Sequence, residues 1–291
     1  MRRSALDDRG GIITERGTDR VTVRLRIVAG MVSPDQLRGL ADIAARYNVG
    51  LSLTVRQTIE LFHVDPAHLM DLISDLEKNG TPLGSEKTEV VNVTACPGID
   101  RCVFGLIDSL DLAKKIDSIH FGRDMPVKTR ISVSSCPHSC MSERLCEIGV
   151  TGVVRPQRKS GDCTGCDNCT QYCKKGAISV KNGLLHMDME KCILCGMCIL
   201  SCPYGIIHAD PPAYQITVGG RRGTSPAAGR HLVTVKSPKE ALRVVGLVVE
   251  WIYRSAWDGA LLSDQLNDLN FDRFKGRVLA DLPPDEIETG Y

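Results

Sequence analysis

The sequence has few aromatic residues, almost no net charge and no long hydrophobic run. Phe, Trp and Tyr make up 4% of the 291 residues, which argues against a surface on which nucleic-acid bases stack. The 36 Lys and Arg residues nearly balance the 35 Asp and Glu residues, so a protein that binds nucleic acid by neutralising phosphates is also disfavoured. With 43% hydrophobic and 24% charged residues, the composition is that of a globular chain and excludes wholesale disorder.

No segment has the pattern of a secretory signal or a membrane span. The first ten residues are polar and charged, which predicts no signal peptide. The longest apolar segment, residues 241–253, is interrupted by Arg243 and Glu250 and is too short to cross a bilayer. We therefore expect a cytoplasmic protein with no membrane span and no nucleic-acid partner.

Cysteine, in contrast, is abundant. In a reducing compartment, 13 cysteines indicate metal ligands or catalytic thiols rather than disulfides. The odd number also makes complete disulfide pairing impossible.

The first third of the chain has the periodicity of a ferredoxin-like β-α-β-β-α-β unit. Ser33 and Pro34 form a helix-start signal with Gln36, and Gly50 and Gly80 mark the expected helix ends. The expected strands are residues 20–28, 51–55, 59–64 and 89–95, and the expected helices run from Ser33 to Gly50 and from Asp65 to Gly80.

The composition changes near Arg155, where a cysteine-rich block begins. After that block, residues 214–218 alternate as a strand, residues 219–223 form a glycine-rich basic turn, and Ser237 starts another helix. The pattern predicts an α+β protein in which one compact module interrupts another. The expected domains are residues 15–88, then 89–160 together with 211–291, and an insert at 161–210.

Eight cysteines of the insert form the spacing C-x2-C-x2-C-x3-C twice, the pattern of bacterial two-cluster ferredoxins. In that pattern the fourth cysteine of each run ligates the other cluster. The predicted ligand sets for two 4Fe-4S clusters are Cys163, Cys166, Cys169 and Cys202, and Cys192, Cys195, Cys198 and Cys173. Zinc, which also takes four thiolates, is the alternative, although it typically uses pairs of cysteines.

Four further cysteines have the spacing C-x5-C (Cys96, Cys102) and C-x3-C (Cys136, Cys140). With residues 92–102, 126–131 and 135–140 around them, the sequence resembles the siroheme-containing sulfite and nitrite reductases. The segment Thr54–Gln57 resembles the Arg-Gln signature of that family, and residues 214–223 resemble its Gly-Gly-basic turn. The insert makes the chain most similar to the dissimilatory type and to the C subunit of anaerobic sulfite reductase.

The resemblance implies a third 4Fe-4S cluster on Cys96, Cys102, Cys136 and Cys140, with Cys140 also ligating the siroheme iron. It implies that Arg56, Lys128 and Arg130 bind the substrate anion in a pocket that also supplies protons, with Arg130 contributing charge rather than ready proton donation. Candidate partners for the siroheme carboxylates are Arg101, Arg123, Arg221, Arg222 and Arg230. Without the resemblance, Arg56 would be read as a solvated charge, and Lys128 and Arg130 as an exposed strand edge.

The implied reaction is the six-electron reduction of sulfite to sulfide, with electrons entering through the insert. The alternatives are a nitrite reductase of the same family and an electron-transfer protein without catalysis. No nicotinamide or flavin fingerprint is evident, so the donor is expected to be another subunit or a ferredoxin. Because longer relatives contain two copies of this unit, we expect a homo- or hetero-oligomer in which the cations can serve a neighbouring subunit. Cys146 fits no ligand set and is expected to be a buried small side chain.

Overall fold

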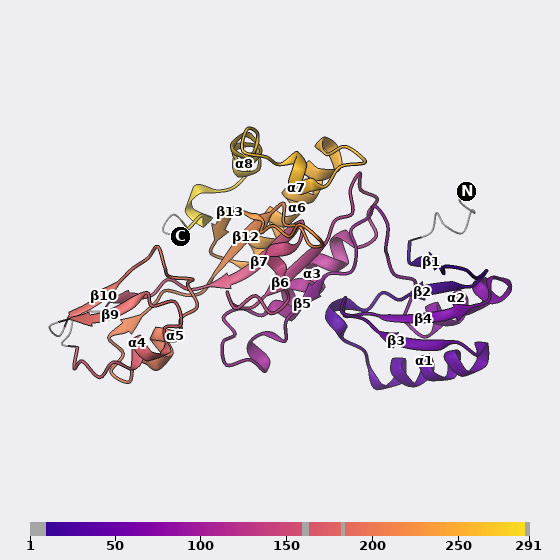
Figure 1. Ribbon diagram of the computed structural model, residues 1–291, viewed down its shortest axis with the longest axis horizontal. Helices are drawn as coiled ribbons and strands as arrows, with labels where there is room; N and C mark the ends of the chain where they lie inside the picture. The colour runs from indigo at the N-terminus through magenta and orange to yellow at the C-terminus, as the bar shows by residue number, and fades with distance from the viewer. Residues whose placement is uncertain (1–9, 159–162, 182–183, 289–291) are drawn as a thin grey trace.

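The structure, a computed structural model, describes residues 10–158, 163–181 and 184–288. The expected polar segment 1–9, the first two residues of the expected insert (161–162) and residues 289–291 lie outside the described residues. Three units follow one another across the molecule in Figure 1: an N-terminal unit, a central unit and a cysteine-rich unit.

The N-terminal unit is an antiparallel four-stranded sheet in the order β1-β2-β4-β3, with two helices. Leu40 and Ile43 of the first helix and Leu72 and Leu76 of the second pack with Leu61 in one buried cluster. The elements are β1 (Ile12–Thr14), β2 (Val21–Arg24), α1 (Pro34–Tyr47), β3 (Gly50–Leu53), β4 (Ile59–Val64) and α2 (Leu69–Lys78), the last preceded by a 3-10 turn, η3 (Pro66–His68).

The helix-start signal at Ser33 is confirmed. The Ser33 hydroxyl accepts from the Gln36 backbone N–H at 3.1 Å, and the Gln36 side chain accepts from the Ser33 N–H at 2.9 Å. This reciprocal pair satisfies two of the N–H groups that a helix start otherwise leaves unpaired.

The expected closing strand at 89–95 is wrong. Beside β2 lies β1, which pairs Ile12 with Val23 and Thr14 with Val21. Of the expected segment, only β5 (Thr94–Ala95) is a strand, and it pairs in parallel with β6 of the central unit. Periodicity gave no signal for β1 because a three-residue strand is too short to show alternation.

The central unit is a five-stranded sheet in the order β13-β12-β7-β6-β5, in which β5, β6 and β7 are parallel and β7, β12 and β13 antiparallel. Helices α3 and α6 pack on it, and their apolar residues share one buried cluster with the strands. The elements are α3 (Ser109–His120), β6 (Ile131–Ser134), β7 (Ile148–Val153), β12 (Ala213–Val218), β13 (Arg230–Val235), α6 (Pro238–Ser255), α7 (Leu262–Gln265) and α8 (Phe271–Leu279), with 3-10 turns η2 (Val28–Gly30), η4 (Gly98–Asp100), η5 (Glu143–Leu145) and η6 (Pro284–Glu286).

The two faces of β6 differ in chemistry. Ile131 and Val133 belong to the apolar cluster under the helices. Ser132 and Ser134, which alternate with them and therefore point to the opposite face, are equally buried. The face away from α3 and α6 is thus polar, and β6 leads directly from it into Ser135 and Cys136.

The cysteine-rich unit holds two short helices and two small antiparallel pairs, β10-β9 and β11-β8. The pair β8 and β11 joins the entry and exit of the unit, so that the flanking chain stays continuous with the central sheet. The elements are β8 (Gln157–Arg158), α4 (Asn168–Tyr172), β9 (Ile178–Lys181), β10 (Leu184–Met187), α5 (Met197–Ser201) and β11 (Ile207–His208). Figure 1 places this unit on the side of the central sheet away from the N-terminal unit.

Candidate functional site

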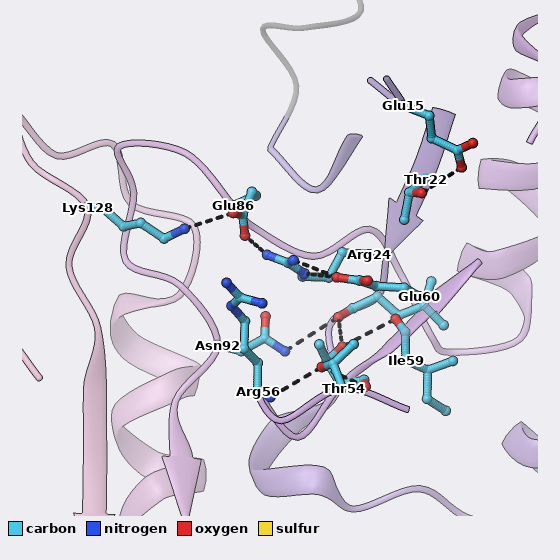
Figure 2. Close-up of polar contacts among 12 residues, drawn as sticks. Glu15, Thr22, Arg24, Thr54, Arg56, Ile59, Glu60, Glu86, Asn92 and Lys128 are labelled. Carbon is cyan, nitrogen blue, oxygen red and sulfur yellow. Dashed lines mark hydrogen bonds and ion pairs between the residues drawn. The ribbon is translucent and has the colours of Figure 1, made fainter. Parts of the chain in front are cut away.

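A cavity of about 340 Å³ lies where the N-terminal and central units meet. It contains all three predicted substrate cations, Arg56, Lys128 and Arg130. Figure 2 shows Arg56 and Lys128, together with Arg24, pointing toward the same space from separate segments. Its full lining is Arg24, Val55, Arg56, Thr58, Ser85, Glu86, Val91, Asn92, Thr94, Lys128, Arg130, Ile131, Cys146 and Arg222. Five of these lining residues are basic and one is acidic, so the lining carries an excess of positive charge.

Arg56 reaches the cavity because the next residue, Gln57, docks on the central unit. The Gln57 side-chain amide donates to the Ala95 carbonyl at 2.7 Å and accepts from the Ala95 N–H at 2.8 Å. Gln57 adopts a left-handed backbone conformation (φ 56°) in the turn between β3 and β4. Arg56 itself is exposed and, among the described residues, has no ion-pair partner within 4 Å.

The Lys128 side chain has a lowered pKa. Burial, with the nearby guanidinium groups of Arg56, Arg24 and Arg130, lowers its pKa to about 8, against an opposing effect of Glu147. Its Nζ atom lies 2.9 Å from a Glu86 carboxylate oxygen (Figure 2). A lysine with this pKa gives up a proton more readily than an ordinary one.

Arg24 also lines the cavity, although no motif in the sequence pointed to it. Only 4% of Arg24 is exposed, and its guanidinium is ion-paired with both Glu86 and Glu60. It occupies a polar position of an alternating strand, which by pattern alone is read as a solvated side chain.

Arg130 is held by a bidentate pair with Glu147, at 2.8 Å from Nε and 2.6 Å from Nη2. The Glu147 side chain also accepts from the Arg130 backbone N–H at 3.0 Å. A carboxylate bonded in this way keeps the guanidinium in one orientation at the cavity wall.

The five arginines expected to bind the siroheme carboxylates do not share one site. Only Arg222 lines the cavity, donating to the Met141 carbonyl at 2.9 Å, directly after Cys140. Arg123 pairs with Glu250, and Arg221 pairs with Asp264. Arg230 pairs with Asp268, and Arg101 lies exposed in the loop between Cys96 and Cys102.

Cys146 is buried, as expected, but it also lines the cavity. Its Sγ atom lies 3.3 Å from Arg222 Nη2, and burial raises its pKa to about 11 even with Arg222 and Arg130 nearby. Its spacing from the other cysteines gave no sign of this position.

The C-x5-C and C-x3-C cysteines come together beside the end of β6. The pKa of Cys136 is raised to about 11, chiefly by burial and further by Cys102, Cys96 and Cys140. None of these four cysteines forms a disulfide. The Ser135 hydroxyl accepts from the N–H groups of Leu106 and Ile107, each at 3.1 Å. That contact ties the two cysteine segments together.

The eight remaining cysteines line two separate cavities. Cys163, Cys166, Cys169 and Cys202 line one, and Cys173, Cys192, Cys195 and Cys198 line the other, of about 510 Å³. In each cavity the fourth cysteine comes from the other C-x2-C-x2-C-x3-C run. The pKa of Cys202 is lowered, because backbone N–H groups of residues 204–207 outweigh the effect of burial.

The chemistry of these donors fits iron–sulfur clusters, which take four thiolates each. In the described part of the chain, no group of three or more His, Cys, Asp or Glu side chains is placed closely enough to hold a single metal ion. Two of the sets of four are grouped because their cysteines line the same cavity. The third set is grouped because Cys96, Cys102 and Cys140 act electrostatically on Cys136.

The second of these cavities borders the central unit. Its lining includes Phe104, from the loop that follows Cys102, and His138, between Cys136 and Cys140. The two rings lie 4.9 Å apart between centroids. The Val154 N–H, just after β7, also donates to the Leu194 carbonyl at 2.9 Å. The Cys192–Cys198 loop is thus attached to the central sheet.

Within the described residues, no helix has the length and apolarity needed to cross a membrane.

Comparison with known proteins gives two family matches. Residues 86–283 match the nitrite and sulphite reductase 4Fe-4S domain, and residues 13–79 match the nitrite/sulfite reductase ferredoxin-like half domain. The coenzyme F420-dependent sulfite reductase of Methanocaldococcus jannaschii is 31% identical over 223 residues, which cover 76% of this chain and 36% of that protein. The dissimilatory-type sulfite reductase subunit beta of Archaeoglobus fulgidus is 29% identical over 206 residues, covering 64% and 56%.

A solved structure, dissimilatory sulfite reductase I, has a similar fold. It matches with a TM-score of 0.72 at 16% identity, over 97% of this chain and 78% of that one. The chain spans 36% of the length of the coenzyme F420-dependent relative and 56% of that of the dissimilatory-type subunit. Because one family model alone matches more than half of the residues, the chain belongs to the nitrite and sulfite reductase family.

Proposed function

We propose that the chain is a siroheme-dependent sulfite reductase that reduces sulfite to sulfide with six electrons. The observation that carries the proposal is the cavity in which Arg56, Lys128 and Arg130 converge with Arg24 and Arg222. Sulfite is a small oxyanion, and the five cations of the cavity outnumber the three carboxylates that pair with them, those of Glu60, Glu86 and Glu147, so the cavity favours such a substrate electrostatically.

The cofactors are assigned to residues by their chemistry. We propose that Cys96, Cys102, Cys136 and Cys140 ligate one 4Fe-4S cluster and that Cys140 also ligates the siroheme iron. Together these groups would supply an electron-rich iron centre for sulfur reduction. Arg222 is the arginine best placed for a siroheme carboxylate, because it lines the cavity and contacts the residue after Cys140.

The roles of the cations differ. Arg24 and Arg130 are each fixed by carboxylates, so they provide oriented positive charge. Lys128, with a pKa of about 8, is protonated at neutral pH and is the cavity group best suited to give a proton to a substrate oxygen. A guanidinium barely deprotonates, so neither arginine can take that role.

The cysteine-rich unit is proposed to bring electrons in through two 4Fe-4S clusters. The first would be held by Cys163, Cys166, Cys169 and Cys202, and the second by Cys173, Cys192, Cys195 and Cys198. The second cluster would pass electrons on to the cluster of the central unit. Support for this order comes from Phe104 and His138, which line the second cavity and belong to the cysteine motifs of the central unit. The donor would be another subunit or a ferredoxin.

We also propose that the active form is an oligomer. Leu53 and Val55, which precede Arg56, are 85% and 90% exposed. Large apolar side chains of this kind beside a charged cavity are typical of an interface. A second subunit at this edge would cover them and border the cavity.

The test is a spectrum and an assay on anaerobically purified protein. We expect siroheme absorption bands together with sulfite-dependent oxidation of a low-potential donor and formation of sulfide. Iron–sulfur absorption without siroheme would refute the proposal in favour of an electron carrier. A parallel assay with nitrite, with ammonia measured as product, distinguishes the nitrite reductase.

A further inference from the structure

We propose that Glu143 is a positioning residue for the cluster on Cys96, Cys102, Cys136 and Cys140. Its buried carboxylate holds the C-x3-C loop in place and, as a negative charge in the interior, lowers the reduction potential of that cluster. The inference rests on the proposed function only in requiring a cluster at these four cysteines.

The carboxylate of Glu143 has three hydroxyl donors. Its Oε2 atom accepts from Ser134 Oγ at 2.6 Å and from Ser139 Oγ at 2.8 Å. Its Oε1 atom accepts from Thr151 Oγ1 at 2.8 Å. Glu143 is 0% exposed, so these hydroxyls take the place of water.

The three donors come from three parts of the site. Ser134 ends β6, and Thr151 is its register partner on β7. Ser139 lies in the loop between Cys136 and Cys140, where it adopts a left-handed backbone conformation (φ 58°). The Glu143 side chain therefore connects the C-x3-C loop to two strands of the central sheet.

The backbone beside Glu143 is also closely packed. A Cβ atom at Gly149 of β7 would lie 2.5 Å from the Glu143 carbonyl oxygen. Glycine at this position lets the η5 turn approach the sheet, which brings the carboxylate under the loop.

No cation lies within hydrogen-bonding distance of this carboxylate among the described residues. The nearest is the neighbouring Arg144, whose Nε atom is 3.9 Å from Oε1. Arg24 and Arg130 differ in this respect, because each is directly bonded to its carboxylate. Charge that is buried and incompletely neutralised acts over longer distances than charge in water. Reduction adds an electron to the cluster, so a fixed anion beside its ligand loop disfavours reduction.

The test compares Glu143→Gln with Glu240→Gln in the full-length holoprotein. Glutamine keeps the shape of glutamate and can still bond to the three hydroxyls, but it removes the charge. Glu240 is a matched control, since it is a buried carboxylate at the start of α6 and lies outside every cysteine site described above. The readout is a redox titration followed by electron paramagnetic resonance, in which the two clusters of the cysteine-rich unit serve as internal references.

We expect the potential of the central cluster to rise in Glu143→Gln, with unchanged reference clusters and no shift in Glu240→Gln. An unchanged central potential in a loaded Glu143→Gln protein would overturn the proposal. If Glu143→Gln does not retain the central cluster, Glu143→Asp decides. Retention with Asp, which keeps the charge but not the shape, supports the carboxylate, and loss with Asp as well refutes it. These signals are read whether or not sulfite is reduced, so the proposed function can fail independently.

Discussion

The side chain of Gln57 pairs with both backbone polar groups of Ala95, at 2.7 and 2.8 Å. Gln57 follows the cavity residue Arg56, and Ala95 precedes Cys96, a proposed cluster ligand. This contact between the N-terminal and central units thus fixes the proposed substrate cation Arg56 relative to the proposed cluster.

Removing that contact is expected to reduce activity. Gln57→Ala leaves the two Ala95 groups without their partner, at a cost of about 1–3 kcal/mol. We expect kcat/KM for sulfite to fall by about tenfold or more because Arg56 loses its position. Gln36→Ala removes the capping contact of α1 and a hydrogen bond to the Gly80 carbonyl, neither of which involves a cavity residue, so it should leave kcat/KM unchanged. Equal kcat/KM in the two variants would contradict this role.

The pH dependence of activity should follow Lys128. Below its pKa of about 8 the side chain carries a proton, and above it the proton is lost. We therefore expect kcat/KM for sulfite to decline as the pH rises through about 8. Lys128→Arg keeps the charge at all these pH values, so it should abolish that decline while lowering kcat. The same decline in both proteins would assign it to another group, sulfite itself included.

Cys140 and Cys146 offer a matched pair of substitutions. Cys140→Ser is expected to remove the ligand of the siroheme iron and the central cluster with it, reducing the iron content from about thirteen to about eight atoms per chain. Cys146→Ser should keep all the iron and the siroheme bands, because Cys146 lies outside the three sets of four. Iron analysis and visible absorption check both variants. Full siroheme retention in Cys140→Ser would refute the assignment.

The exchange of fourth ligands within the cysteine-rich unit can be tested in the same way. Cys173→Ser should eliminate the cluster that borders Phe104 and His138 and block electron delivery from an external donor. Cys202→Ser should eliminate the other cluster. Paramagnetic resonance of the reduced proteins distinguishes them. If each substitution instead removes the cluster of its own run, the crossed ligand sets are wrong.

Mixing two inactive variants tests whether the cavity serves a neighbouring subunit. In an oligomer that places Lys128 against the siroheme of its partner, mixing Cys140→Ser with Lys128→Met restores one working site per mixed pair. About a quarter of the sites in a random mixture of dimers would then be active. Absence of any recovery, with exchange of subunits verified by mass, would show that the cations act within their own chain.

Local sequence signals predicted much of the secondary structure. Ser33 and Ser237 each start a helix as expected, because capping depends only on residues within one turn. The closing strand at 89–95 was wrong, since the sheet to which a strand belongs depends on partners far away in sequence. Periodicity cannot distinguish between β2 and β6 as that partner.

The sequence by itself provided the chemical hypothesis: cysteine spacing and the family resemblance predicted three sets of four ligands, and the resemblance of the Arg-Gln segment predicted a substrate cation. Only the tertiary structure decided which charges share the cavity. Arg24, Glu86 and Cys146 have no motif around them, and they meet Lys128 and Arg222 because two folded units pack against each other. The proposed role of Glu143 also has no motif behind it, since its contacts depend on the register of β6 and β7. Ligand spacing is a local property of the chain, whereas burial and the pairing of charges arise only when distant segments come into contact.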